Sequence, residues 1–246
     1  MANTPLKLSA SAVSAFAECP YRYARDYVDR LPDAERAPAP ALGFGISVHR
    51  ALAEFFRGGG HAVLTASDLI GLLRANWDRS QFTDTPEEQE YVRRGMDLMR
   101  RFWESRFPPR EWVVTGIERW AEWPRPHRDI IARGRLDLVC RRPDGVVEVV
   151  DWKTGSRPAT EEEMAADPQA AFYRSLAATA FGNPKPPDFR ITFRYVGLGQ
   201  SASIYFAEDD FREVWNWIAV AGEGIRKAAF VLNQGSALES AYLRKV

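Results

Sequence analysis

The chain has 246 residues, of which 46% are hydrophobic and 27% are charged, and this is the composition of an ordinary soluble globular protein. Its 33 lysines and arginines balance its 33 aspartates and glutamates, so global charge argues neither for nor against a nucleic-acid ligand, and a polyanion site would have to come from local clusters. Two cysteines exclude a disulfide framework and fit a reducing cytoplasm, and no run of about 18 apolar residues predicts a membrane span.

The N-terminus resembles a secretory signal only loosely. Lys7 precedes a partly apolar run over residues 8–17, but serines 9, 11 and 14 make that run too polar, and Glu18 follows directly. We therefore expect a cytoplasmic protein with no membrane partner.

The pattern of the first 108 residues predicts helices. Apolar residues recur at helical spacing from Ser9 onward, and Pro20 is expected to kink or divide this first helix. The second helix carries His49 and ends at three consecutive glycines. The expected helices span residues 9–29, 42–57, 67–80 and 86–107, with a proline-containing linker at 31–40.

The pattern changes after Pro109, where segments rich in Val, Ile and Trp predict strands. Strands are expected at 111–123, 129–153, 189–197 and 201–207, and helices at 168–181 and 209–227. This order predicts an α/β sandwich with a helical N-terminal elaboration. We expect one domain over residues 1–246, made of a mainly helical part (1–108), an α/β core (109–230) and a polar tail (231–246).

Residues 133–155 carry the most informative pattern. Pro143-Asp144-Gly145 separates two apolar runs and is a turn signal. If it forms a type I turn with Gly145 left-handed in a bulge, residue 142 faces residue 146. This register places Asp137 opposite Asp151, with Lys153 on the same face as Asp151.

Two opposed carboxylates in otherwise apolar strands require an explanation, because like charges directly opposite each other destabilise a sheet. A divalent cation such as Mg²⁺ supplies one, since it takes carboxylate, water and phosphate oxygens as ligands. Lys153 would add positive charge beside a scissile phosphate. The alternative is that these side chains are merely solvated on an exposed face, and a slip of one residue would separate the two carboxylates.

These residues resemble a known signature. Gly134-Arg135-Leu136-Asp137 followed by Val149-Val150-Asp151-Trp152-Lys153-Thr154-Gly155 is similar to the PD-(D/E)XK nuclease signature in its RecB-like exonuclease form, as in RecB, AddB and the CRISPR-adaptation nucleases. Each short motif is weak alone, and specificity comes from their common order over about residues 8–230. Three further elements match in that order: Ser9-x-Ser11 with Cys19-Pro20, Gly45-x-x-x-His49, and Gln169-x-x-x-Tyr173.

The resemblance implies a restriction-endonuclease-like core, a mixed sheet flanked by helices, and a role for each matching residue. His49, Asp137, Asp151 and the backbone carbonyl of Trp152 would bind Mg²⁺ or Mn²⁺. Lys153 would orient or activate the attacking water and stabilise phosphate charge. Gln169 and Tyr173, four residues apart on one helical face, would position the active site or the DNA strand. The alternatives are a satisfied, partly buried histidine for His49 and core packing for Tyr173.

One departure concerns cysteine. Several relatives hold a [4Fe–4S] cluster with one cysteine in the N-terminal Cys-Pro motif and three near the C-terminus. Here Cys19 stands in the first place, but residues 230–246 contain no cysteine and Cys140 lies within the predicted hairpin. One chain with two cysteines cannot assemble a four-cysteine cluster, so no iron–sulfur cluster is expected. We expect Cys19 to be a small, buried apolar residue.

Other contacts with DNA are less defined in the sequence. Glu118 is either an acid that supports the metal ligands or an exposed strand residue. Seven arginines near the predicted hairpin could contact DNA phosphates, although arginines are ordinarily solvated at the surface. Three tryptophans could stack on bases, although tryptophans ordinarily pack in the core. They are Arg119, Arg125, Arg128, Arg133, Arg135, Arg141 and Arg142, with Trp120, Trp123 and Trp152.

Three functions are therefore carried forward. The first is a metal-dependent DNA nuclease, expected to be an exonuclease in DNA repair, recombination or CRISPR- or phage-related processing. Its substrate would be single-stranded DNA or duplex ends, and its protein partner would be a helicase or another DNA-processing protein. The second is a catalytically silent DNA-binding or scaffold module on the same fold, which need not keep Asp137, Asp151 and Lys153 together. The third is another metal-dependent phosphodiesterase or an RNA-directed enzyme.

Overall fold

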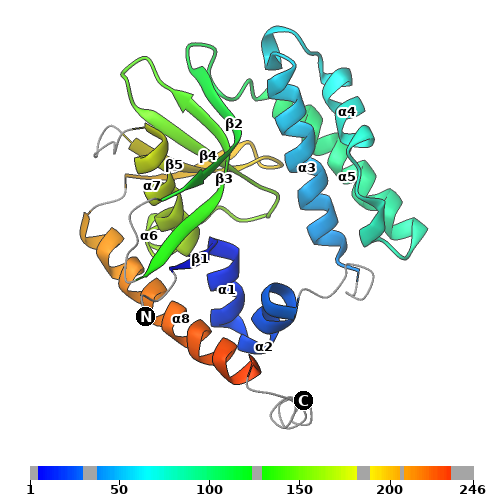
Figure 1. The fold of residues 1–246 in the computed structure, drawn as a ribbon. Helices are drawn as coiled ribbons and strands as arrows, with labels where there is room; N and C mark the ends of the chain where they lie inside the picture. Colours follow the sequence, from blue (N-terminus) through cyan, green and yellow to red (C-terminus); the bar gives the residue numbers. More distant parts are fainter. Residues whose placement is uncertain (1–4, 30–37, 124–128, 182–188, 206–207, 234–246) are drawn as a thin grey trace.

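A mixed sheet of six strands lies between two layers of helices (Figure 1). The computed structural model describes residues 5–29, 38–123, 129–181, 189–205 and 208–233. The strands are β1 (Leu6–Leu8), β2 (Val113–Glu122), β3 (Ile130–Arg141), β4 (Val147–Lys153), β5 (Phe189–Tyr195) and β6 (Gln200–Ile204). They follow the order β1-β3-β4-β5-β6, with β2 also paired to β3, and β1–β3 and β4–β5 are the parallel pairs.

The helices flank this sheet on both sides. They are α1 (Ala10–Glu18), α2 (Pro20–Tyr23), α3 (Pro40–Arg57), α4 (Ala66–Ala75), α5 (Thr85–Glu104), α6 (Glu161–Ala165), α7 (Pro168–Phe181) and α8 (Glu208–Asn233). Helices α3, α4 and α5 gather on one side, whereas α1, α7 and α8 lie on the other (Figure 1). A π-helical turn (Ala24–Asp29) and two short 3₁₀ turns (Gly60–Ala62 and Arg79–Gln81) complete the described helical segments.

Each helical layer has its own apolar core against one face of the sheet. Side chains at alternate positions of a strand point to opposite faces, and β4 follows this rule. Val147 and Val149 pack in the core that contains α7 and α8, while Val150 and Trp152 pack against α3 and α5. The expected mixed sheet flanked by helices is thus confirmed, and none of the described helices combines the length and apolarity needed to cross a bilayer.

The turn between β3 and β4 has the predicted geometry. Gly145 has a φ of 88°, and Arg142 N–H donates to the Val146 carbonyl at 2.9 Å. The ladder pairs Arg141 with Val147 and continues to Leu138 and Val150. The predicted register is therefore confirmed up to the pair that precedes Asp137 and Asp151.

Strand β3 bends at Asp137, where the β3–β4 ladder ends. Leu136 and Leu138 are two residues apart and would share a face in a regular strand. Instead, Leu136 packs with the α7 core and Leu138 with the α3 core. Because β3 and β4 separate beyond Leu138, the Trp152 N–H donates to the Asp137 carboxylate at 3.0 Å rather than to a strand carbonyl.

Several expectations about local structure were incomplete or wrong. Strand β1 and helix α6 were not predicted, whereas the division at Pro20 is confirmed by the end of α1 at Glu18 and the start of α2 at Pro20. Cys19 is exposed rather than buried, because its backbone is extended between α1 and α2 and turns the side chain away from the core.

Two other expectations concern segments at the edge of the described chain. Helix α8 continues to Asn233, and residues 234–246 of the tail expected at 231–246 lie outside the described residues. Most of the linker expected at 31–40 also lies outside them, and α3 already begins at Pro40.

Candidate active site

Five elements bring the predicted site residues to the point where β3 and β4 separate. Helix α3 supplies His49, β3 supplies Asp137 and β4 supplies Asp151 and Lys153, while α7 supplies Gln169 and Tyr173. Strand β2 supplies Glu118. The two helical layers thus each contribute polar side chains to one break in the sheet.

His49 connects Asp137 with the backbone of β4. Its Nδ1 lies 3.1 Å from Asp137 Oδ2, and its Nε2 lies 2.8 Å from the Trp152 carbonyl oxygen. The same Asp137 oxygen accepts the Trp152 N–H. An imidazole nitrogen, a carboxylate and a carbonyl therefore converge on one small volume.

Asp151 faces the other helical layer. Its Oδ1 accepts hydrogen bonds from the Tyr173 hydroxyl and from Gln169 Nε2, the latter at 2.9 Å. Its Oδ2 lies 2.7 Å from Lys153 Nζ, and Lys153 Nζ also donates to Gln169 Oε1 at 2.6 Å. Tyr173 and Gln169, one helical turn apart, therefore fix both the carboxylate and the ammonium.

The charges of the site perturb the ionisation of its members. Burial alone would lower the pKa of His49, but the hydrogen bond and charge of Asp137, with the charges of Asp151 and Glu118, raise it to about 9. Burial raises the pKa of Asp151. The charge of Lys153 lowers this pKa, whereas the charge of Asp137 raises it further. Burial would likewise lower the pKa of Lys153, but Asp151 raises it. Lys153 is therefore a charged ammonium at neutral pH.

Glu118 lies much closer to the predicted metal ligands than the sequence indicates. Donor atoms of His49, Glu118 and Asp137 all lie within 4.8 Å of one another. Glu118 Oε2 pairs with Arg135 Nε at 2.5 Å, and the Glu118 side chain is only 10% exposed. Burial and the charge of Asp137 raise the pKa of Glu118, while Arg135 opposes that shift.

The β2–β3 register explains why the sequence left the role of Glu118 open. Between the pairs Ile117–Leu138 and Arg119–Leu136, Glu118 stands opposite Asp137. The segment joining β2 to β3 has no short turn motif comparable to Pro143-Asp144-Gly145, so no local signal set that register. Glu118 and Arg119 are the first charged residues after the uncharged stretch Val113–Ile117, and this was the available signal.

The donor set suits a hard divalent cation. Such ions bind carboxylate and carbonyl oxygens, and imidazole nitrogen is a common further ligand. Asp151 Oδ2 is buried, and among the described residues its close polar contact is the ion pair with Lys153 at 2.7 Å. Asp151 lies outside the compact group formed by His49, Glu118 and Asp137.

Two hollows adjoin the site, and Arg135 lines both. One, with a volume of about 710 Å³, runs along α3 and is lined by His49, Glu118, Arg50 and Arg57. The other, of about 370 Å³, is lined by Gln169 and Tyr173 together with Ser9, Ser11 and Arg133. Basic side chains thus lie on both approaches to the polar cluster.

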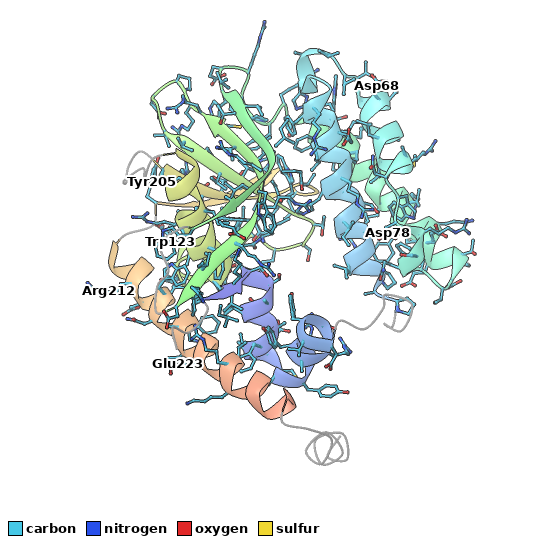
Figure 2. All side chains as sticks on the ribbon, in the orientation of Figure 1. Asp68, Asp78, Trp123, Tyr205, Arg212 and Glu223 are labelled. Carbon is cyan, nitrogen blue, oxygen red and sulfur yellow. The ribbon has the colours of Figure 1, made fainter. Side chains whose placement is uncertain are left out.

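The suggested tryptophan contacts are not equivalent. Trp152 is 2% exposed and stacks on Phe56 with ring centroids 5.8 Å apart, so base stacking by Trp152 is wrong. Trp123, labelled in Figure 2, packs against Trp215 of α8 at 4.9 Å. Trp120 is 60% exposed and stays available to a ligand. Arg125 and Arg128 lie outside the described residues.

Comparisons with known proteins agree with this geometry. A family model described as the PD-(D/E)XK nuclease superfamily matches residues 7–237. A crystal structure from Eubacterium rectale, of a protein provisionally named an exonuclease, is similar with a TM-score of 0.56 and 14% identity, covering 92% of this chain and 82% of that one. This likeness supports the fold. A search among curated proteins finds no match.

Proposed function

Because the chain belongs to the PD-(D/E)XK nuclease superfamily, which its match over residues 7–237 establishes, we propose that it is a divalent-metal-dependent deoxyribonuclease that hydrolyses DNA phosphodiester bonds. The observation that carries the proposal is the convergence of Asp137, Asp151 and Lys153 at the break between β3 and β4. We expect exonuclease action, in DNA repair, recombination or CRISPR- or phage-related processing.

His49, Asp137, Asp151 and the Trp152 carbonyl are the groups that would hold Mg²⁺ or Mn²⁺. His49 and Asp137 already lie within 3.1 Å of each other, and His49 contacts the Trp152 carbonyl at 2.8 Å. When bound, the cation supplies Lewis-acid chemistry by withdrawing charge from a phosphoryl oxygen.

Lys153 supplies a fixed positive charge to the reaction. Its ammonium is held by Asp151 on one side and by Gln169 on the other, so it does not have to reorganise when phosphate charge increases. Preorganised charge of this kind stabilises a transition state more than the ground state. Lys153 also has hydrogen-bond donors with which to orient an attacking water.

Gln169 and Tyr173 position these groups rather than react themselves. The Gln169 amide donates to Asp151 and to the Tyr173 hydroxyl, at 2.9 and 2.8 Å, and its oxygen accepts from Lys153. One side chain thus sets the separation of the carboxylate and the ammonium. The helix α7 that carries both residues is packed against α1 and β3, which keeps the positions rigid.

The test is a cleavage assay with end-labelled single-stranded DNA, duplex DNA and RNA. Wild-type protein should cut DNA with Mg²⁺ or Mn²⁺ and stop when EDTA removes the metal. Asp151→Asn should abolish cutting, and Glu122→Gln, on the same sheet but away from the cluster, should not. Metal-dependent cutting of RNA alone would contradict the proposed substrate. DNA binding without cutting at any metal concentration would instead indicate a silent scaffold module.

A further inference from the structure

We propose that Glu118 is itself a ligand of the divalent cation, which extends the predicted ligand set from α3, β3 and β4 to β2. The inference rests on the proposed function, since it concerns the cation of the same site. It assigns a direct metal contact to a residue for which the sequence left only a supporting or a solvated role.

The distances between donor atoms support this role. One donor atom from each of His49, Glu118 and Asp137 lies within 4.8 Å of the other two. Ligands on opposite sides of one Mg²⁺ ion are separated by about 4.2 Å, because each bond is about 2.1 Å long. Side-chain shifts of less than about 1 Å therefore suffice to close the three groups around one ion.

Glu118 lies beside a second buried carboxylate, with the charges of Arg135, His49 and Arg57 as partial compensation. Its side chain is 10% exposed and that of Asp137 is 9% exposed, so two acidic groups face each other largely out of water. The described ion-pair partner of Glu118 is Arg135, whose side chain is 61% exposed. A solvated guanidinium at the rim compensates a buried carboxylate less well than an ion bound between the two acids.

The pairing with Arg135 leaves Glu118 able to bind an ion. The printed contact uses Oε2, and a carboxylate has two oxygens with about four lone-pair positions. Glu118, His49 and Arg135 also line the same hollow of about 710 Å³, so this side of the cluster is open to water and to substrate. The proposal thus places the cation toward α3, with Asp151 and Lys153 on its far side.

The first test measures Mn²⁺ binding directly, by the electron paramagnetic resonance signal of free Mn²⁺ titrated with the full chain. Glu118→Gln keeps the shape of the side chain and removes its charge, and we expect its dissociation constant to rise at least about tenfold. Glu122→Gln is the matched control on the same strand, because Glu122 pairs with Lys7 at the surface, and its affinity should stay that of wild type. Unchanged Mn²⁺ affinity in Glu118→Gln would overturn the inference.

Arg135→Gln separates metal ligation from a purely structural pair. If Glu118 acts only by pairing with Arg135, both substitutions should weaken Mn²⁺ binding alike, which would overturn the inference. If Glu118 is a ligand, Arg135→Gln should bind Mn²⁺ at least as well as wild type, because a competitor for the carboxylate is removed.

A thiolate at position 118 gives a direct signature. Thiolates prefer soft metals, so the Glu118→Cys variant should bind Cd²⁺ and show a thiolate-to-metal absorption band. The control variant Glu122→Cys should lack this band, and circular dichroism checks that both variants fold. A folded Glu118→Cys variant without this band would overturn the inference. The proposed function is tested separately by wild-type cleavage. A wild-type chain that cuts DNA and binds Mn²⁺, with Glu118→Gln unchanged, refutes the inference alone, whereas a wild-type chain that binds no Mn²⁺ refutes both.

Discussion

Replacing Lys153 with methionine would remove the charge that the structure fixes beside Asp151. Methionine keeps most of the aliphatic stem, so packing near the Phe193 ring, which lies 4.2 Å from Lys153 Nζ, is largely preserved. The change therefore isolates the ion pair with Asp151, in which the two atoms are 2.7 Å apart and the side chains are 27% and 3% exposed.

The expected loss of stability lies between two limits. Breaking a fully buried ion pair costs about 3–5 kcal/mol, whereas an exposed pair contributes about 0–1 kcal/mol. Lys153 keeps about a quarter of its surface in water, and Asp151 retains hydrogen bonds from Tyr173 and Gln169. We therefore expect the metal-free variant to lose about 2 kcal/mol of unfolding free energy, a fall in Tm of about 4–8 °C for a chain of this size.

The assay is urea unfolding followed by tryptophan fluorescence, without metal and then with Mn²⁺. Mn²⁺ should narrow the difference from wild type, because a bound cation compensates the charge of Asp151. Lys7→Met is the matched control, since its pair with Glu122 is 50% and 36% exposed and should change stability by less than about 1 kcal/mol. An unchanged urea midpoint for Lys153→Met would refute the buried-pair reasoning, and DNA cleavage at the wild-type rate would refute the role proposed for Lys153.

Three further predictions follow from contacts around the site. Tyr173→Phe removes the hydroxyl that forms hydrogen bonds with Asp151 and Gln169, so the free energy of unfolding should fall by about 1–3 kcal/mol. The kcat for DNA cleavage should fall more than KM changes, and a wild-type kcat would contradict a positioning role. Trp152→Ala should lose about 3–5 kcal/mol in urea unfolding, because the indole is buried against aromatic rings, and a loss below about 1 kcal/mol would contradict that packing. A thiol reagent at pH 8 should modify Cys19 alone in native protein and both cysteines in denaturant. Cys19 is exposed, whereas burial raises the pKa of Cys140 to about 12 and keeps it protonated, and native modification of Cys140 would show that the β3–β4 core opens.

Local signals were sufficient for the hairpin at the centre of the site. A turn of Pro143, Asp144 and Gly145 fixes the residues that face each other across it, since a left-handed glycine permits only a few loop geometries. The observed pairs, from Arg141–Val147 to Leu138–Val150, follow that register. Start and stop signals similarly located α3, α5 and α7, and the family resemblance identified His49, Gln169 and Tyr173 on α3 and α7.

Features that depend on distant contacts were not predictable in the same way. Strand β1 has three residues, and it forms only because it pairs in parallel with β3, where Leu6 faces Ile130 far along the chain. The side chain of Trp152 looked available for base stacking, yet it packs against Phe56 of α3. The outward turn of Cys19 depends on how α1 and α2 meet, which periodicity does not describe.

The sequence by itself determined which residue types occur, in which order, and the register of the β3–β4 hairpin, whose turn is local. It could thereby predict an α/β fold and place Asp137, Asp151 and Lys153 together. Only the tertiary structure decided that β3 bends at Asp137, that His49 spans to the Trp152 carbonyl, and that Glu118 joins them within 4.8 Å. The physical reason is that a turn is specified by neighbouring dihedral angles, whereas the position of α3 and β2 against the hairpin is set by packing between residues far apart in the chain.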